Sequence, residues 1–452
     1  MRSVTASDRC EAPNRRPWTL APGGGPRDGP LAGSSDRSPV FARARILDPG
    51  WGPMTPPDDR SSLIRIAFAS TYPPRRCGIA TFTSDLSRSM DDREIVALTP
   101  PDHQGSYPSE VHHRIRRDEW TDYPRVARAL DRCRIDAVSI QHEFGIWGGD
   151  DGEHVIDFVE GLRAPAVATL HTVLREPTAH QRRILIDLVD ATSATVVMSR
   201  ATASLLSEAY GVAPERIEVI AHGVPELPLV DPDTLKAGLG LEGREVILSF
   251  GLLGPGKGYE QAIAAMPAVV AAHPQARYII LGATHPDLVR TEGEAYRQNL
   301  TARIAALGMT KHVQLVDQFV GRRELARWLE AADIFVTPYP NLDQIVSGTL
   351  AYAMSAGKAI VSTPYAYATE LLAGDRGVLV EPGSIASLSD AFIGLLAETE
   401  RRKAIGARAY AHSRGMIWPE VGAAYRRLFA RVIGVPAPAR MALDTRVAHA
   451  DV

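Results

Sequence analysis

The chain carries, at residues 333–357, the stretch DIFVTPYPNLDQIVSGTLAYAMSAG. An apolar run typical of a buried strand leads into a polar loop, and a helix of small residues is expected to begin near Ser347, Gly348 and Thr349. The N–H groups at the start of such a helix favour an anion, and Gly348 lets a ligand approach the backbone closely. The stretch therefore predicts a phosphate site at the end of a strand in an α/β fold.

A second loop of this kind follows the apolar run EVILSFG and reads SFGLLGPGKG at residues 249–258. Lys257 in this loop can meet phosphate oxygens as a point charge. Gly258 follows the lysine where a nucleotide-hydrolysing loop has Ser or Thr, and Gly-Leu-Leu-Gly does not fit the dinucleotide fingerprint. Two phosphate-type loops on one sheet predict a diphosphate ligand, and they disfavour an ATPase or a dehydrogenase.

Length and charge narrow the function class. The 452 residues, 45% of them hydrophobic, are enough for two or three domains with sizeable cores. The 50 basic and 53 acidic residues give a formal net charge of -3. This balance does not favour a polyanionic partner such as a nucleic acid, so small ligands are the expected partners.

Features of location point to the cytoplasm. No apolar run approaches the roughly 20 residues of a membrane span, and the N-terminus lacks the apolar core of a signal peptide. Three cysteines, Cys10, Cys77 and Cys133, lack paired spacing, so reduced thiols are expected. The segment AHQRRILIDLVD at 179–190 has two interpretations, peripheral contact with an anionic membrane surface or a core-facing helix.

Short apolar runs alternate with helix-length segments from Ile64 onward, in two series. The first series is IRIAFAS, EIVALT, AVSIQHE, PAVATLH, ATVVMS and IEVIAHG, and the second is EVILSFG, YIILGAT, HVQLVDQ, DIFVTPY, KAIVSTP and GVLVEPG. The alternation predicts parallel βαβ units, and hence an α/β chain of two Rossmann-like domains. In such sheets ligands bind outside the carboxyl ends of the strands, so a site is expected in the cleft between the domains.

Changes in composition predict the domain boundaries. Residues 1–60 contain 10 Pro and 7 Gly and no sustained apolar periodicity, so they are expected to be disordered. Met54 leaves open whether this tail is a flexible leader or an over-extended start. The expected organisation is a tail at 1–60, an N-terminal Rossmann-like domain at 61–223, a linker at 224–243, a C-terminal Rossmann-like domain at 244–415, a helix crossing back to the N-terminal domain at 416–435, and a tail at 436–452.

Polar residues follow several strands of the first series. Arg75 and Arg76 precede Gly78, where a helix is expected to start, and they can neutralise an anionic acceptor; the alternative is a turn with solvated arginines. The next such loop, QHEFGIWGG, offers His142 and Glu143 for sugar hydroxyls, and Trp147 as a stacking surface; a structural loop is the alternative.

Two further residues at strand ends have open interpretations. His171 ends the strand AVATL, and its position parallel to His142 favours a place in the same cleft, although a lone histidine is more often structural. Glu370 follows Ser362-Thr-Pro364 and begins a short helix, where it is either a ligand-binding acid or a first-turn acid stabilised by the helix dipole.

The order of PPRRCGIATF, HTVLREP, HGVP, GLLGPGKG, the long stretch from Thr337 to Leu372, and GVLVEPG resembles that of family 4 glycosyltransferases with the GT-B fold, over residues 64–435. The resemblance implies two facing Rossmann-like domains, a nucleoside-diphosphate sugar held mainly by the C-terminal domain, and an acceptor held mainly by the N-terminal one. It also implies retention of the anomeric configuration without a catalytic metal or another cofactor.

The same resemblance assigns roles by position. The expected catalytic residues are His171, next to the donor sugar, and Lys257, on the diphosphate. The residue types in the loops described above, and not the resemblance, give the expected acceptor-binding residues, which are Arg75, Arg76, His142, Glu143 and Trp147. The expected donor-binding residues are Gly78, Gly251, Lys257, Gly258, Gln344, Ser347, Gly348, Thr349 and Glu370.

The chain departs from the family pattern at two places. Gly251-Leu252 stands where many members have Gly-Arg before the lysine, so one diphosphate cation is missing. Gln344 and Tyr352 stand at the family's paired glutamates, eight positions apart, the second of which usually binds the donor ribose. Asp343 can replace the first glutamate only by a one-residue shift.

The leading hypothesis is therefore a retaining glycosyltransferase. It would move a hexose, mannose or glucose, from a UDP- or GDP-sugar to a hydroxyl of a glycan, a lipid-linked saccharide or a small metabolite. Two alternatives follow from the departures and from the fold. One is a catalytically weak or inactive relative that binds sugar nucleotides as a sensor or partner subunit, and the other is a sugar-nucleotide epimerase.

Overall fold

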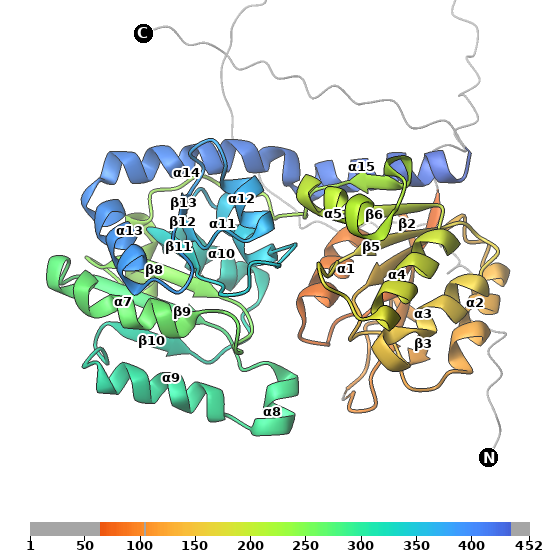
Figure 1. Ribbon diagram of the computed structural model, residues 1–452, viewed down its shortest axis with the longest axis horizontal. Coiled ribbons are helices and arrows are strands. Elements are labelled where there is room, and N and C mark those ends of the chain that lie inside the picture. The colour runs from red at the N-terminus through yellow and green to blue at the C-terminus, as the bar shows by residue number, and fades with distance from the viewer. Residues whose placement is uncertain (1–63, 104, 435–452) are drawn as a thin grey trace, which may run out of the picture. The chain divides into compact units, whose positions relative to one another are not determined.

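Seven parallel strands form the first sheet of the computed structural model, which describes residues 64–103 and 105–434 (Figure 1). Each neighbouring pair of strands runs parallel. The spatial order is β3-β2-β1-β4-β5-β6-β7. The strands are β1 (Arg65–Ser70), β2 (Asp92–Thr99), β3 (Val111–Arg116), β4 (Ala137–His142), β5 (Ala166–Leu170), β6 (Ala194–Val197) and β7 (Ile217–Val219).

Six parallel strands form the second sheet, in the order β10-β9-β8-β11-β12-β13. They are β8 (Glu245–Phe250), β9 (Ala276–Leu281), β10 (Val313–Val316), β11 (Ile334–Thr337), β12 (Ala359–Ser362) and β13 (Val378–Leu379). We call residues 64–223 the N-terminal half and residues 224–434 the C-terminal half. Both belong to one compact unit of the chain.

Helices flank both sheets (Figure 1). The N-terminal half contains α1 (Gly78–Arg88), α2 (Asp122–Arg132), α3 (His154–Glu160), α4 (Ala179–Ala191) and α5 (Arg200–Tyr210). The C-terminal half contains α6 (Asp233–Lys236), α7 (Tyr259–Ala272), α8 (Pro286–Glu292), α9 (Ala295–Ala306), α10 (Arg322–Ala331), α11 (Gly348–Ser355), α12 (Ala366–Leu372), α13 (Ile385–Ala397), α14 (Thr399–Ser413) and α15 (Trp418–Val432).

The strands are apolar on both faces because both faces are covered. In β1, Ile66 and Phe68 pack into one hydrophobic cluster while Ala67 and Ala69 pack into another. A continuous apolar run is what a parallel strand between two helical layers requires. The expectation of an α/β fold with two parallel sheets is confirmed.

The strand order reverses direction once in each sheet, between β1 and β4 in the first and between β8 and β11 in the second. The chain leaves the two strands of such a pair in opposite directions, which opens a crevice at their carboxyl ends. The loops after β1, β4, β8 and β11 therefore lie where ligands bind in this class of sheet, and they carry most of the candidate residues.

Strand β3 is missing from the sequence-based prediction. Its sequence, VHHRIR, is polar, and it lies at the edge of its sheet with only Ile115 fully buried. An edge strand of this kind has no continuous apolar run, so hydrophobic pattern alone does not reveal it.

The membrane-contact interpretation of 179–190 is wrong for its aliphatic side chains. These residues form α4, and its buried side chains, Ile184, Leu185, Leu188 and Val189, belong to the core. The guanidinium of Arg182 lies 5.2 Å from the centre of the Tyr210 ring. The core-facing alternative is thus confirmed, and among the described residues no helix is long and apolar enough to span a bilayer.

Cys77, the N-cap of α1, is a free thiol, as expected. Cys10 lies outside the described residues. The predicted tails at 1–60 and 436–452 lie outside them as well.

The C-terminal helix α15 contacts the N-terminal half. The hydroxyl of Tyr425 lies 3.0 Å from Oγ1 of Thr169 in β5, and the guanidinium of Arg426 donates to the carbonyl of Ser89 after α1. The predicted linker at 224–243 contains α6 and a short 3-10 helix at Ala237–Leu239. The domain boundaries themselves stay a prediction.

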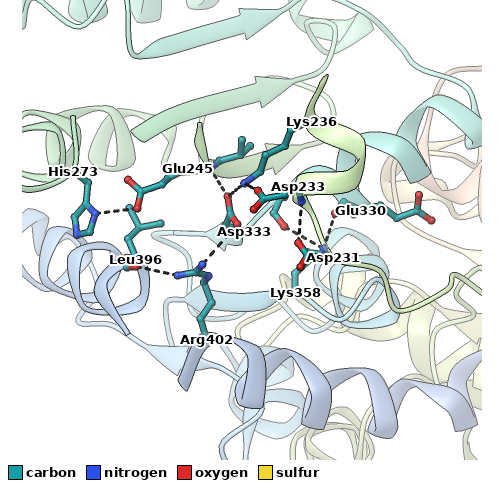
Figure 2. Close-up of polar contacts among 12 residues, drawn as sticks. Asp231, Asp233, Lys236, Glu245, His273, Glu330, Asp333, Lys358, Leu396 and Arg402 are labelled. Carbon is teal, nitrogen blue, oxygen red and sulfur yellow. Dashed lines mark hydrogen bonds and ion pairs between the residues drawn. The ribbon is translucent and has the colours of Figure 1, made fainter. Parts of the chain in front are cut away.

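A buried charge network fixes the amino ends of β8 and β11. Asp333 precedes β11, and its Oδ2 accepts hydrogen bonds from the Val246 N–H at 2.7 Å and from Nζ of Lys236 at 2.8 Å. Figure 2 shows Asp333 between Lys236 and Arg402, with Lys358 nearby. Because Asp333 is almost fully buried, its charge depends on these cations. The network holds in register the two strands whose carboxyl ends carry the phosphate-type loops.

Lys358 gives the network a testable pH dependence. Its buried Nζ donates to the carbonyls of Glu330 and Ala332, and burial lowers the pKa of Lys358 to about 8. Between that value and the ordinary lysine pKa, the unfolded chain binds a proton that the folded chain does not, so stability rises with pH. We expect the unfolding free energy of wild type, relative to Lys358→Met, to rise above pH 8 by at most about 1.4 kcal/mol per pH unit. Urea titrations from pH 7 to 10 measure this; a flat difference would contradict it.

Candidate active site

The start of α11 has free hydrogen-bonding capacity. Ser347 is the N-cap in an extended conformation, and its Oγ accepts from the Leu350 N–H at 3.3 Å. Gly348 and Thr349 occupy the first turn, whose N–H groups have no partner within a helix. Thr349 Oγ1 lies 3.1 Å from Ser347 Oγ and 3.0 Å from the hydroxyl of Tyr339. Backbone donors, hydroxyls and the helix dipole thus converge on one point.

The loop after β8 meets this helix start. Nζ of Lys257 lies 4.6 Å from the centre of the Tyr339 ring, whose hydroxyl contacts Thr349. A Cβ on Gly251 would lie 3.5 Å from the Thr349 methyl group. Gly258, the N-cap of α7, is in the left-handed region with φ 71°. The structure therefore brings together Gly251, Lys257, Gly258, Ser347, Gly348 and Thr349, and the cluster is positive.

His171 lies directly after β5 and is a neutral imidazole. Its Nε2 lies 2.9 Å from Oε1 of Gln141, and its ring packs edge-on against Phe82 at 4.9 Å. Burial first, and then the charges of His222 and His142, lower the pKa of His171 to about 3. A neutral ring at physiological pH is suited to hydrogen bonding, and it cannot offer a positive charge to a phosphate.

His222 is a residue that the sequence-based analysis missed. It follows β7, and its Nδ1 lies 2.8 Å from the Gly223 carbonyl. A Cβ on Gly348 would come within 2.9 Å of its Nε2, so His222 stands directly against the start of α11. The motif HGVP was a signal, because it places this histidine at a strand end like His142 and His171.

The loop after β4 is less available than expected. The predicted stacking role of Trp147 is wrong: its ring is 2% exposed, packs near Phe158, and donates from Nε1 to the Gln141 carbonyl at 3.0 Å. His142 is fully buried, and burial lowers its pKa to about 4. The carboxylate of Glu143 accepts from the Gly145 N–H, and burial raises its pKa.

The loop after β1 presents two arginines beside the start of α1. Helix α1 begins at Gly78, as predicted, and nothing lies within 4 Å of a Cβ built there, so the space before it is open. The guanidinium of Arg76 lies 5.8 Å from the centre of the Phe319 ring. The positive charge of Arg75 favours the ionised form of Glu143 in the loop after β4, against the effect of burial on its pKa.

Gln344 and Asp343 belong to the loop before α11. Nε2 of Gln344 donates to the Val346 carbonyl at 2.7 Å, so this side chain supports the loop. Asp343 accepts from Nε of Arg175 at 3.0 Å. Asp343 and Arg175 also line a small pocket. The other lining residues come from both halves and are Ala201, Thr202, Leu205, Ile345 and Ala366.

Tyr352 makes a contact that a glutamate would not make. It lies one turn after Gly348 on α11, and its hydroxyl donates to Oδ2 of Asp85 in α1 at 3.3 Å. Arg322 of α10 forms an ion pair with the same carboxylate. Burial raises the pKa of Asp85 in spite of this arginine. The carboxyl group of Asp85 therefore ties α1 to α10 and α11.

Glu370 caps a helix of the other half. Its two carboxylate oxygens accept from the N–H groups of Arg200 at 3.0 Å and Ala201 at 2.9 Å, at the start of α5. Acceptors at this position satisfy orphan donors and the helix dipole. The carboxylate is thus occupied in this structure, and the donor-binding role of Glu370 stays a prediction.

Glu370→Ala distinguishes the two roles. We expect it to lower the unfolding free energy by about 1–2 kcal/mol, because two N–H groups of α5 lose their acceptor. Urea denaturation measures this, with the exposed Glu400 replaced by alanine as the control. If the variant instead keeps its stability and weakens only nucleotide binding, the carboxylate serves the ligand and the capping role is wrong.

Family models match both halves of the chain. Residues 77–226 match the model described as Glycosyltransferase Family 4, and residues 231–412 match Glycosyl transferases group 1. Together they span most of the chain, and their boundary falls close to the predicted linker.

Curated relatives share modest identity with this chain. It is 24% identical, over 77% of its length and 92% of the relative's, to the GDP-mannose-dependent monoacylated alpha-(1-6)-phosphatidylinositol monomannoside mannosyltransferase of Corynebacterium glutamicum. It is 29% identical to the D-inositol 3-phosphate glycosyltransferase of Xylanimonas cellulosilytica, over 59% of this chain and 66% of that one. It is 27% identical to the phosphatidyl-myo-inositol mannosyltransferase of Mycolicibacterium smegmatis, over 48% and 52% of the two chains.

Solved structures show the same fold. HepE from Anabaena, in complex with UDP and glucose, superposes with a TM-score of 0.65 at 18% identity, covering 81% of this chain and all of HepE. Sucrose-phosphate synthase from Thermosynechococcus elongatus gives a TM-score of 0.67 at 15% identity, covering 82% and 99% of the two chains. The expectation of a GT-B fold is thereby confirmed. With both family models matched in chain order, the chain belongs to the family 4 glycosyltransferases of the group 1 type and is a glycosyltransferase.

Proposed function

We propose that this enzyme transfers a hexosyl group, mannose or glucose, from a UDP- or GDP-sugar to a hydroxyl of a glycan, a lipid-linked saccharide or a small metabolite. The observation that carries the proposal is the convergence of Lys257 with the first turn of α11 through Tyr339 and Thr349. A lysine, two backbone N–H groups and a helix dipole suit a diphosphate better than a neutral ligand.

The reaction we propose retains the anomeric configuration and uses no bound metal or other cofactor. The bond from the anomeric carbon to the diphosphate oxygen breaks, and an acceptor oxygen forms the new bond on the same face. The acceptor's proton passes to the leaving diphosphate. Lys257 and the start of α11 stabilise the negative charge that develops there, and the halves position the reactants.

The relatives support both candidate nucleotides and an anionic acceptor. One relative is named for GDP-mannose, and HepE binds UDP. Two are named for phosphorylated inositol or phosphatidylinositol acceptors. Arg75 and Arg76, beside the open start of α1, would meet such a phosphate. A cytoplasmic location, with peripheral membrane contact when the acceptor is lipid-linked, is part of this proposal.

A donor and acceptor panel tests the proposal. Purified protein is incubated with UDP- and GDP-linked mannose and glucose, and with inositol phosphate, phosphatidylinositol or simple glycosides. Transfer by one donor, an α-linked product from an α-linked donor by NMR, and full activity in EDTA support the proposal. If no pair of donor and acceptor gives either transfer or donor hydrolysis, the proposal is overturned.

A binding-only role is favoured by one specific observation. Tyr352 and Gln344 occupy the family's glutamate positions and are engaged with Asp85 and with the Val346 carbonyl. Nucleotide binding without transfer, in the same panel, supports a sensor or partner subunit. A changed donor sugar in the absence of any acceptor would indicate the epimerase alternative.

A further inference from the structure

The ammonium group of Lys257 has an aromatic ring as its partner. Its Nζ lies 4.6 Å from the centre of the Tyr339 ring, and within the part of the chain that the structure describes no carboxylate pairs with it. A lysine ammonium at this distance is attracted to the electron-rich face of the ring. The ring occupies one side of the ammonium, so N–H groups on its other side stay available to the oxygen atoms of a ligand.

Tyr339 is held in place by contacts other than the lysine. Its side chain is 6% exposed, and its ring stacks on that of Tyr365, with 5.2 Å between centres and 18° between planes. Its carbonyl accepts from Oγ1 of Thr363 at 2.6 Å. A lysine, by contrast, ends in a flexible four-carbon stem. The ring of Tyr339 therefore determines where the ammonium of Lys257 lies, and not the reverse.

The same tyrosine relates the two phosphate-type loops to each other. Its ring face contacts Lys257 in the loop after β8, and its hydroxyl lies 3.0 Å from Oγ1 of Thr349 in the first turn of α11. The lysine and the first-turn N–H groups have to meet one and the same diphosphate. A lysine that is already ordered loses less rotamer freedom when the ligand binds.

We propose that Tyr339 is a positioning residue for the transfer reaction. Its ring holds the ammonium of Lys257, before the donor arrives, at the place where lysine and the start of α11 can bind the diphosphate together. This inference rests on the proposed function and deepens it.

Two substitutions of Tyr339 separate its ring from its hydroxyl. Tyr339→Leu removes the ring, and we expect it to weaken binding of the free nucleoside diphosphate about fivefold. Tyr339→Phe keeps the ring and should bind within about twofold of wild type. Calorimetry measures this with UDP or GDP, whichever wild type binds.

Tyr367→Leu is the matched control, because Tyr367 is a fully buried tyrosine of α12 in the same hydrophobic cluster as Tyr339. This variant should lose stability and bind the diphosphate as wild type does. Melting temperatures of the unliganded variants show that each of them is folded.

A double-mutant cycle tests whether Tyr339 acts through Lys257. In the wild-type background we expect Tyr339→Leu to lower kcat/KM for the donor about fivefold. In the Lys257→Ala background the same substitution should lower kcat/KM less than about twofold, because the ammonium that the ring positions is gone. A merely structural role of the tyrosine would lower kcat/KM equally in both backgrounds.

Nuclear magnetic resonance reports the position of the lysine directly. The chain has only five lysines, so the signals of lysine labelled at the ε carbon can be assigned by single substitutions; they are Lys236, Lys257, Lys311, Lys358 and Lys403. Protons over the face of an aromatic ring are shielded by its ring current. We expect the ε-methylene protons of Lys257 to be shifted upfield in ligand-free wild type and Tyr339→Phe, and to lose this shift in Tyr339→Leu.

Four results would overturn the inference while the proposed function stands. They are an equal loss of kcat/KM in both backgrounds, a loss in Tyr339→Phe as large as in Tyr339→Leu, no weakening in Tyr339→Leu, and an unshifted Lys257 signal in wild type. If wild type binds neither UDP nor GDP, the proposed function fails first, and this inference fails with it. If wild type binds one of them but transfers no sugar, the proposed function is overturned, and calorimetry and the Lys257 signal decide the role of Tyr339.

Discussion

Replacing Lys257 with alanine is expected to lower kcat/KM for the nucleotide-sugar donor by about a hundredfold or more. Lys257 is the cation of the phosphate-type cluster, and Leu252 stands where many family members carry a second one. In the reaction we propose, with no arginine at position 252, Lys257 and the start of α11 stabilise the charge that develops on the leaving diphosphate. We expect thermal stabilisation by the nucleoside diphosphate to disappear in the same variant.

The control for this variant is Lys403→Ala, which removes an exposed lysine from α14 and should change neither quantity. Lys257→Arg should recover part of the activity, because charge is kept while its geometry changes. A Lys257→Ala enzyme with wild-type kcat/KM and wild-type nucleotide binding would show that the diphosphate binds elsewhere.

Gly258→Ala is expected to lower the unfolding free energy by about 3 kcal/mol. A left-handed conformation costs about 1–2 kcal/mol for an alanine, and the new Cβ would lie 1.9 Å from the Pro338 carbonyl oxygen. That oxygen belongs to the backbone between β11 and α11, so relief of the clash moves the loop after β8 away from the loop after β11. Overpacking of this kind adds about 1–3 kcal/mol.

Gly256→Ala is the matched control. Gly256 lies in the same loop with φ 84°, and nothing lies within 4 Å of a Cβ built there. The Gly256→Ala substitution therefore costs only the free energy of holding an alanine in the left-handed conformation. Urea denaturation of both variants isolates the clash as the difference between them, about 2 kcal/mol. Equal losses of unfolding free energy in the two variants would mean that the loops after β8 and β11 move apart without strain.

The fold was predictable because its strands are buried on both faces. Continuous apolar runs such as EVILSF and RIAFAS identify central parallel strands regardless of neighbours. The edge strand β3 has a polar sequence and was missed for that reason. Its pairing with β2, rather than its own composition, makes it a strand.

The candidate site was predictable in part, for a similar reason. Lys257 and Ser347 lie in the loops that follow β8 and β11, and the carboxyl end of a parallel strand fixes the edge of the sheet at which its loop lies. Partners from other elements were not predictable: Glu370 meets the start of α5, 170 residues away from Arg200 in sequence, and Trp147 turns into the core. His222 was within reach, since it lies in the loop that follows a strand, β7, as His171 follows β5.

The contact between Tyr352 and Asp85 constrains the order in which substitutions can accumulate. The carboxyl group of Asp85 is nearly buried, and its pKa is already raised by burial. A glutamate at position 352 would bring a second carboxylate to the same spot, and like charges there disfavour each other's ionised form. A Tyr352→Glu substitution would therefore be tolerated only together with replacement of Asp85, so positions 85 and 352 can change as a pair but not singly.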